Sequence, residues 1–427
     1  LTGTMAELDH TMTLGLAYVN NRASFGQGTQ FGYLLPDRTV MPVDGPGAFA
    51  DGTQASENAF DARVDLNSSS ASLGLYALER LRLTDALRLD LAARFDRTSV
   101  HNRDRITPGG GTGSLDSDPV FQRLNPGATL VWTPGDDAEL ALAWSQASRA
   151  PSAVELGCSD PASPCRLPNA LAGDPPLRQV IARTLEARAQ LRRKGWSLRA
   201  SLFRTVASDD ILFVTDDPSG YGYFRNFGQT RRQGLEVAGT AALGRVTLSA
   251  SYALLDATFR SPEMVGGAAN SSNDGPAPGF EGNIAVRPGD RIPLLPRHLV
   301  KAALEWMPVA PLTLTLDMVG ASASIARGNE NGAHRADGAH YLGPGQSGGY
   351  SLFNAGAALR PWPGVTLFIA VRNLLNRRYA TAAQLGPAAF DAGGNFIARP
   401  FSGPVIDGER PLVSSTFYAP SAPRSVQ

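Results

Sequence analysis

The residues with the most reactive side chains in this chain are two cysteines, Cys158 and Cys165, which share one Pro- and Ser-rich stretch. In an oxidising compartment such a pair can form a disulfide that closes a small loop and stiffens it. A metal site is the alternative, but it needs further ligands, and the nearest histidines in sequence, His101 and His298, are distant. The spacing therefore favours a disulfide.

Motifs for catalysis are missing from the sequence. The two lysines, Lys194 and Lys301, do not follow the glycine spacing of a phosphate-binding loop. No serine stands in a nucleophile elbow, and the five histidines lack the spacing of metal ligands. His334 and His340 share one loop and could bind a metal complex, although solvated loop residues are the favoured interpretation. We therefore expect no enzyme, no cofactor and no resident metal.

Charged residues instead alternate with apolar ones. In the segment 87–96, leucine, alanine and phenylalanine hold the odd positions, and most even positions hold arginine or aspartate. Side chains of a strand point to opposite faces in turn, so this pattern predicts a strand with one apolar and one charged face. The same period of two recurs at 246–252, 312–318 and 365–372, with Phe368 as an exception.

The connections between the expected strands alternate between short and long. The short ones lie at 83–86, 134–137, 193–195, 243–244, 308–311 and 361–364. The long ones lie at about 21–70, 97–120, 149–179, 206–222, 258–296, 321–349 and 376–410. Transmembrane barrels have short periplasmic turns and longer extracellular loops, whereas a soluble sandwich has no reason to sort its loops in this way.

Tryptophan placement and overall composition agree with a barrel. Trp132, Trp196, Trp306 and Trp362 stand beside the short connections, as in an aromatic girdle at a membrane interface, while Trp144 lies towards the other end. No apolar run reaches the ~18 residues of a transmembrane helix. The 39 basic residues equal the 39 acidic ones, so the chain lacks the excess of positive charge that is typical of nucleic-acid-binding proteins.

Three motifs resemble those of TonB-dependent outer-membrane receptors. They are Arg-Ala-Pro-Ser-Ala-Val-Glu-Leu at 149–156, Asn-Phe-Gly-Gln-Thr-Arg-Arg-Gln-Gly-Leu-Glu at 226–236, and Val-Arg-Asn-Leu-Leu-Asn-Arg-Arg-Tyr-Ala at 371–380. The resemblance covers essentially the whole chain. It implies an all-β fold, an antiparallel transmembrane β-barrel of about 22 strands with a plugged lumen. Residues 1–427 would supply about 13–14 of these strands, as a partial barrel.

By the same resemblance, residues 1–427 would be the C-terminal part of the barrel domain, with Thr11–Asn20 near strand nine. The plug, the TonB-contacting box and the first strands have no counterpart here, and the last strand would be truncated. We therefore expect the sequence to be a fragment.

The resemblance also implies a function. The protein would lie in the outer membrane of a Gram-negative bacterium and mediate TonB-energised uptake of a scarce nutrient, with an iron–siderophore complex as the first candidate. Its partners would be outer-membrane lipid, the TonB complex acting through the plug, and the ferric siderophore. A receptor of the same family for haem, cobalamin, copper or a glycan remains an alternative. So do a passive porin-like channel and an outer-membrane enzyme or adhesin.

Two groups of residues are candidates for the site. Tyr221, Tyr223, Phe224 and Arg225 could contact a flat anionic ligand such as a ferric chelate, since aromatic faces and a guanidinium suit one. An outer aromatic girdle is the competing interpretation of these aromatics, and it is slightly favoured. Eight charged residues are expected to line the lumen and to meet the plug. They are Arg88, Asp90, Arg94, Asp96, Glu186, Arg188, Arg232 and Glu236.

Overall fold

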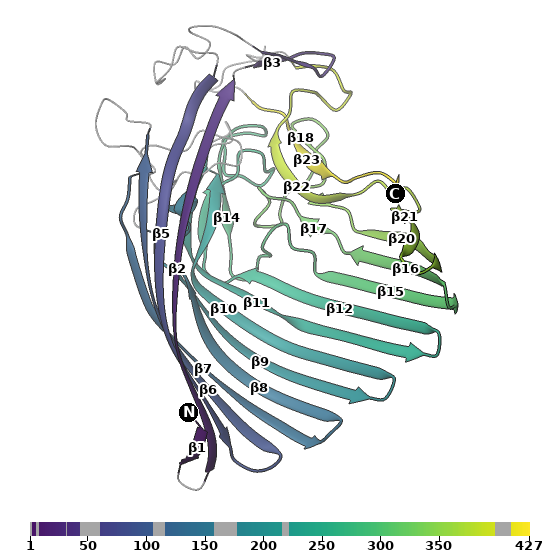
Figure 1. The fold of residues 1–427 in the computed structure, drawn as a ribbon. Coiled ribbons are helices and arrows are strands. Elements are labelled where there is room, and N and C mark those ends of the chain that lie inside the picture. The colour runs from purple at the N-terminus through teal and green to yellow at the C-terminus, as the bar shows by residue number, and fades with distance from the viewer. Residues whose placement is uncertain are drawn as a thin grey trace.

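The fold is one large curved sheet of 15 strands, each antiparallel to its neighbours (Figure 1). The computed structural model describes residues 2–5, 8–30, 32–42, 60–105, 116–157, 177–215, 222–397 and 411–427. The strand order follows the chain from β1 to β24, so each long strand pairs with the long strands next to it in sequence. The expected all-β antiparallel architecture is confirmed.

The long strands range from 8 to 23 residues. They are β2 (Leu8–Gln30), β5 (Phe60–Arg82), β6 (Leu87–Asp104), β7 (Val120–Gly135), β8 (Ala138–Arg149), β9 (Val180–Arg193), β10 (Trp196–Thr215), β11 (Gly222–Leu243), β12 (Val246–Phe259), β15 (His298–Val309), β16 (Leu312–Ala321), β20 (Tyr350–Trp362) and β21 (Val365–Arg372). The short strands β1 (Thr2–Met5) and β24 (Ser425–Val426) complete the sheet at its two edges.

All six tight connections lie where the sequence predicts them. Each joins two sequence-adjacent strands along one rim of the sheet, which we call the turn rim (Figure 1). Gly195 and Gly364 have φ values of 84° and 83° in two of these turns. Only glycine adopts that left-handed conformation at little cost, which explains its place there.

The long connections lie at the opposite rim, the loop rim, but several are shorter than expected. β2 continues to Gln30 and β5 already begins at Phe60, so residues 21–30 and 60–70 of the predicted loop 21–70 belong to strands. β6 likewise continues to Asp104, and β10 continues to Thr215. The upper parts of these strands pair through the backbone while their side chains lose the apolar alternation. The sequence pattern therefore gave no sign of them.

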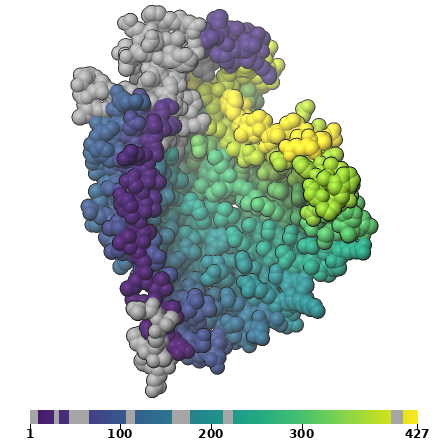
Figure 2. All heavy atoms as spheres, in the orientation of Figure 1, coloured from purple at the N-terminus to yellow at the C-terminus, as the bar shows by residue number. Residues whose placement is uncertain are grey.

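Small elements fill the long connections. They are β3 (Gly32–Leu34) with β4 (Val40–Pro42), the one-turn helix α1 (Ala153–Gly157), β13 (Glu263–Gly266) with β14 (Asn283–Val286), β17 (Ser324–Ile325) with β19 (Gln346–Ser347), and β18 (Tyr341–Leu342) with β23 (Ser414–Pro420) and β22 (Ala380–Pro387). In Figure 2 the β3–β4 hairpin, in dark purple, caps the loop-rim end of the molecule. Within the described part of the chain, no helix is long and apolar enough to cross a membrane.

The two faces of the sheet differ in chemistry. Directly paired residues share a face, and one such row runs through Leu89, Leu130, Leu142, Ala187, Leu202, Leu235 and Leu254. We call this the apolar face. It also carries the five tryptophans, each between 40% and 63% exposed. The opposite, polar face carries the charged positions of the alternating segments, as predicted.

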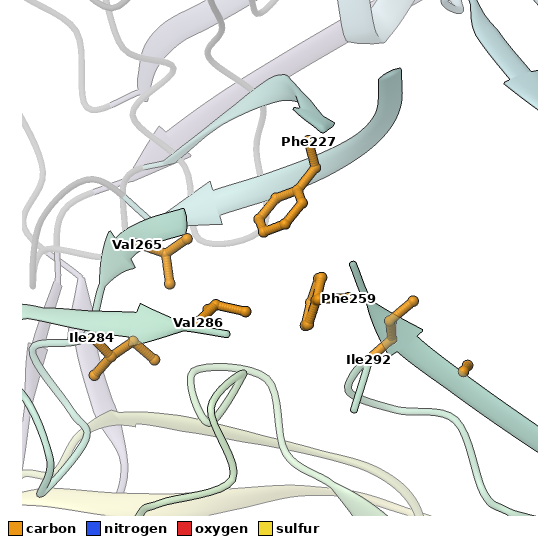
Figure 3. Packing of buried hydrophobic residues seen from close by; sticks show 7 residues of the cluster. Phe227, Phe259, Val265, Ile284, Val286 and Ile292 are labelled. Carbon is orange, nitrogen blue, oxygen red and sulfur yellow. The ribbon is translucent and has the colours of Figure 1, made fainter. Parts of the chain in front are cut away.

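Packed cores occur only towards the loop rim among the described residues. One cluster joins Phe227 and Phe259, whose ring centroids lie 4.8 Å apart, to Val265, Ile284 and Val286 of the β13–β14 hairpin (Figure 3). A second cluster, of Val100, Leu156, Leu177, Val180, Ala207 and Ile211, holds α1 against the sheet. These clusters anchor the long connections over the polar face.

Candidate functional site

The cross-strand register places all eight predicted charged residues on the polar face. One row runs from Asp90 through Thr129, Ala143, Glu186 and Phe203 to Gly234. The other six lie on the same face by alternation along β6, β9 and β11. Their proposed contact with a plug stays a prediction.

Four of the eight form compact ion pairs near one edge of the sheet. Asp90 accepts hydrogen bonds from Arg80, at 2.9 Å, and from Arg88, at 3.1 Å. Arg94 donates to Asp96 at 2.8 Å. These pairs are between about a quarter and two-thirds exposed, so each contributes only ~0–1 kcal/mol to stability. Their main effect is to hold charged side chains in order across the polar face.

The other four are spread over β9 and β11. Glu186 accepts a hydrogen bond from the Ser201 hydroxyl at 2.8 Å and lies 3.9 Å from Arg188. Arg232 donates to Asp210 at 3.1 Å, and Glu236 is exposed. The structure therefore brings these residues to one face but not into one site.

Asp210 is a partner that the sequence pattern does not reveal. Alternation along β10 would turn its side chain to the apolar face, but Asp209 has a φ of 55° and interrupts the alternation. Asp210 is 8% exposed and accepts a hydrogen bond of 2.6 Å from the buried Thr230 hydroxyl as well as those from Arg232. No pattern of apolar residues could have predicted this interruption.

The predicted ligand-contact group is only partly described. Tyr221 lies outside the described residues, and of Tyr223 only the backbone, in β11, is described. Phe224 packs against the second cluster, and Arg225 forms an ion pair with Glu263. Phe224 and Arg225 thus already have intramolecular partners, and ligand contact by this group stays a prediction.

The structure describes the candidate histidines but not the two cysteines. Cys158 and Cys165 lie outside the described residues, so their disulfide stays a prediction. His334 is 2% exposed and its Nδ1 accepts a hydrogen bond from the Ser271 amide, while His340 lies 3.7 Å from Asp337. Within the described ranges, no group of three or more His, Cys, Asp or Glu side chains could hold a metal ion.

The first motif, at 149–156, builds the cap of α1. The Ser152 hydroxyl accepts from the Glu155 amide at 3.2 Å, and the Glu155 carboxylate accepts from the Ser152 amide at 2.7 Å, which is a capping box. Arg149 donates two hydrogen bonds to the same carboxylate, at 2.7 and 3.0 Å. Burial would raise the pKa of Glu155, but the hydrogen bonds from Arg149 and Ser152 hold it below its ordinary value.

The second motif, at 226–236, joins segments that are distant in sequence. The Asn226 side chain donates to the carbonyls of Arg178, at 2.9 Å, and Asp209, at 2.8 Å, and it accepts from the Arg178 amide. Gly234 lies so close to β12 that a Cβ atom there would overlap the Leu254 carbonyl oxygen. The motif thus ties the loop rim to the sheet.

The third motif, at 371–380, turns the chain after β21. Asn373 has a φ of 51° and is 5% exposed. Its side chain donates to the Arg377 carbonyl at 2.9 Å and accepts from the Arg377 amide at 2.8 Å. The Asn373 side chain therefore supplies backbone hydrogen bonds just beyond β21, where the strand pairing ends.

Comparison with known families decides which kind of barrel this is. Residues 2–374 match the family described as TonB dependent receptor-like, beta-barrel. The chain belongs to this family. It is a family of receptors and transporters.

Solved structures with a similar fold include three receptors or transporters. The siderophore receptor PiuA from Acinetobacter baumannii is 15% identical with a TM-score of 0.64, over 100% of this chain and 53% of that one. The Ferric-Catecholate import receptor Fiu from K12 E. coli is 13% identical with a TM-score of 0.61, over 100% and 52%. The copper transporter OprC is 16% identical with a TM-score of 0.61, over 100% and 54%. At such identities the likeness shows the fold alone, and this chain spans about half the length of these proteins.

Proposed function

We propose that the protein is an outer-membrane receptor that takes up a ferric siderophore by a TonB-energised mechanism. The observation that carries the proposal is the match of residues 2–374 to the TonB-dependent receptor barrel. Residues 1–427 would together form the C-terminal part of that barrel, with its polar face towards the lumen and its apolar face towards lipid. The mechanism is binding and gated passage, with no bond chemistry in the described residues.

The chemistry of the two faces supports this placement. A wall between lipid and an aqueous lumen needs one apolar and one polar face, and the row of Leu89, Leu130 and Leu142 lies opposite the charged row of Asp90 and Glu186. The long connections fold over the polar face at the loop rim, where a ligand arriving from outside would meet them.

The ligand class is inferred from the similar proteins. PiuA, Fiu and the ferric citrate transporter FecA are iron-chelate receptors by name, and FecA has a TM-score of 0.60 to this chain. The likeness to OprC makes a copper complex the second candidate. Arginine on the polar face suits anionic chelates, because guanidinium groups bind carboxylates through paired hydrogen bonds.

Uptake by living cells tests the proposal. Iron-starved cells that carry the native gene, and a matched deletion strain, would be given radioactive iron as a ferric catecholate or as ferric citrate. We expect uptake of one chelate that depends on this gene and stops when TonB is removed. Gene-dependent uptake that persists without TonB would instead identify a passive channel. Gene-dependent uptake of copper alone would identify the second candidate.

The two candidate tyrosines offer a more local test. Replacing Tyr221 and Tyr223 together by Ala removes two aromatic contacts, which are worth about 0.5–1.5 kcal/mol each. Affinity for the transported chelate should fall roughly tenfold. Tyr18→Ala is the matched control, since Tyr18 is 63% exposed on the apolar face. Equal affinity in all three proteins would remove the tyrosines from the site while leaving the uptake proposal intact.

A further inference from the structure

A row of long polar side chains interrupts the apolar face towards the loop rim. On successive strands, the apolar residues that directly precede this row are Phe95, Leu124, Trp144, Leu185, Leu202 and Leu235. Two residues further along each strand, on the same face, stand Arg97, Gln122, Gln146, Arg183, Arg204 and Gln233. The register confirms the row where it pairs Gln146 with Arg183 and Arg204 with Gln233.

Three arginines of this edge lie on neighbouring strands. Val206 of β10 pairs with Arg183 of β9 on one side and with Arg231 of β11 on the other. Arg204 precedes Val206 by two residues on the same face, so it lies between the other two and one row nearer the apolar band. Strands are about 4.8 Å apart, so three guanidinium groups can converge on one small anion. We call Arg183, Arg204 and Arg231 the outer arginine cluster.

The charge of this cluster is poorly compensated. Between β6 and β12, the outward positions at this level carry one carboxylate, that of Asp256, which Arg231 and Arg297 share at 3.3 and 3.2 Å. Arg183 donates to the neutral Gln146 at 3.1 Å. Within the described ranges, Arg204 has no ion-pair partner, and the buried Nε of Arg231 has no hydrogen-bond acceptor. On the polar face, by contrast, Arg80, Arg88, Arg94 and Arg232 all contact carboxylates.

The height of the cluster places it at a membrane surface. Trp196, beside a tight turn, and Arg204 are eight residues apart on β10, which is about 26 Å along the strand at ~3.3 Å per residue. The tilt of barrel strands reduces this to about 20 Å, close to the ~25 Å apolar band of an outer-membrane barrel. Trp144, the one tryptophan away from the turn rim, lies in the same cross-strand row as Arg204 and one row below Arg183.

We propose that the outer arginine cluster binds the phosphate group of a lipid in the outer leaflet. The lipid chains would lie against Leu185 and Leu202 while the phosphate accepts hydrogen bonds from the exposed Arg183 and Arg204. Arg231, which is held by Asp256, would add positive charge beside them. Gln146 and Gln233 would donate to neighbouring headgroup oxygens without adding charge. This inference rests on the proposed membrane placement, and it concerns the face opposite the nutrient path.

Lipid retention by the native protein tests the cluster. The protein would be purified in detergent micelles containing bisphosphorylated lipid A, and bound lipid would be counted by native mass spectrometry. We expect phosphate-dependent binding that weakens about tenfold or more in the double variant Arg183→Gln and Arg204→Gln, as expected for two lost charge-assisted contacts. The double variant with Lys at both positions keeps the charge but not the paired geometry, so it should lie in between.

Arg199→Gln is the matched control, because Arg199 is exposed on the same strand but on the polar face. It should bind lipid A like the wild type. Equal binding by the Gln double variant and the wild type would overturn the proposal, and so would equal binding of dephosphorylated lipid A. Displacement of the lipid by millimolar inorganic phosphate would assign the cluster to a free anion instead and would also overturn it.

Binding of the ferric chelate to the same preparations separates this proposal from the proposed function. Loss of lipid selectivity with chelate binding intact refutes the lipid site alone. Lipid selectivity without chelate binding refutes only the proposed ferric-chelate ligand. A native protein that is absent from the outer membrane refutes both.

Discussion

On the polar face, two strand glycines each lie beside an aromatic ring of the neighbouring strand, which leaves no room for a larger side chain. Tyr76 pairs directly with Gly15, and Phe203 pairs directly with Gly234. A Cβ at Gly15 would overlap the Tyr76 ring, and a Cβ at Gly234 would lie 3.0 Å from Cζ of Phe203. An aromatic ring that covers a strand glycine replaces the packing that the glycine lacks, so the pair behaves as a unit.

Gly234→Ala should therefore destabilise the barrel by about 1–3 kcal/mol, since the new methyl group has to displace the β12 backbone at Leu254. The measurement is urea unfolding of the native protein, followed by loss of its compact, heat-modifiable band. Gly127→Ala is the control, because a Cβ there has its nearest neighbours at 3.6 Å. Equal stability of the two variants would refute the close approach of β11 and β12.

His334 is a buried residue whose hydrogen bonds require one neutral tautomer. Its Nδ1 accepts from the Ser271 amide at 3.2 Å, so Nε2 carries the proton and donates to the Gly343 carbonyl at 3.3 Å. Burial lowers the pKa of His334 below its ordinary value, and nearby Arg335 lowers it further against the opposing effect of the Gly343 carbonyl. Protonation would also place a second N–H against the Ser271 amide.

Proton binding by His334 makes the stability of its loop depend on pH in one direction. The unfolded loop binds its proton near pH 6.5, above the pKa of the folded loop. Loop stability is thus complete above about pH 6.5 and falls as the pH drops from there towards the lowered pKa. Hydrogen exchange of residues 326–347 in the native protein, corrected for intrinsic rates, should be faster at pH 5 than at pH 7. His334→Gln should abolish this difference, whereas His340→Gln, at a half-buried position, should preserve it. An unchanged pH effect in His334→Gln would contradict the assignment.

At the scale of elements, alternation in the sequence predicted the parts of the long strands nearest the turn rim but not their full length. In 87–96 every second residue is apolar because one face of the sheet is apolar. The tight turns carry glycine, proline or aspartate, which favour turn conformations. Above that level the apolar alternation lapses, as in Asn67-Ser68-Ser69-Ser70 of β5. Backbone pairing continues there, but the sequence has no apolar alternation from which it could be predicted. The β13–β14 hairpin was not predicted for the same reason.

The candidate site was predictable to the extent that it follows strand parity. Alternation alone assigns Arg88, Asp90 and Glu186 to one face. It could also have located the outward arginines, because Arg183 and Arg204 fall on the leucine positions of their strands. It could not show that Asp210 turns to the polar face, because that depends on the single left-handed residue Asp209. Nor could it show that Arg225 contacts Glu263 from a distant loop.

We expect the one-turn helix α1 to depend on the Glu155 carboxylate more than on the Ser152 hydroxyl. Glu155→Gln keeps an acceptor for the Ser152 amide but loses the charge that holds Arg149, which should cost about 1.5–3 kcal/mol locally. Hydrogen exchange of the Leu156 amide, which donates to the Ser152 carbonyl at 3.0 Å, should then accelerate at least about tenfold.

Ser152→Ala is the comparison for this helix. It leaves the ion pair in place and removes only the hydroxyl cap, worth about 1 kcal/mol, so its effect should be smaller. A larger effect in Ser152→Ala than in Glu155→Gln would show that the cap, rather than the ion pair, holds the helix.

At the scale of the whole molecule, the two edges of the sheet are the weakest part of the described structure. β1 pairs only with residues 8–11 at one end of β2, and β24 pairs only with Val371 and Arg372 of β21. No described pairing joins β1 or β2 to β21 or β24. Most of the outer edge of β2 and of β21 therefore presents backbone N–H and C=O groups without strand partners among the described residues.

Residues 1–427 expressed alone should for this reason fail to insert as a stable barrel. In lipid each unpaired backbone group costs several kcal/mol, and a flat open edge also pairs with other chains, so we expect aggregation on refolding into detergent. The native protein refolded under the same conditions is the control and should give a compact, heat-modifiable band that resists protease. The same band from residues 1–427 alone would contradict the prediction, because it would require β2 and β21 to satisfy each other's edges in a closed barrel of fewer strands.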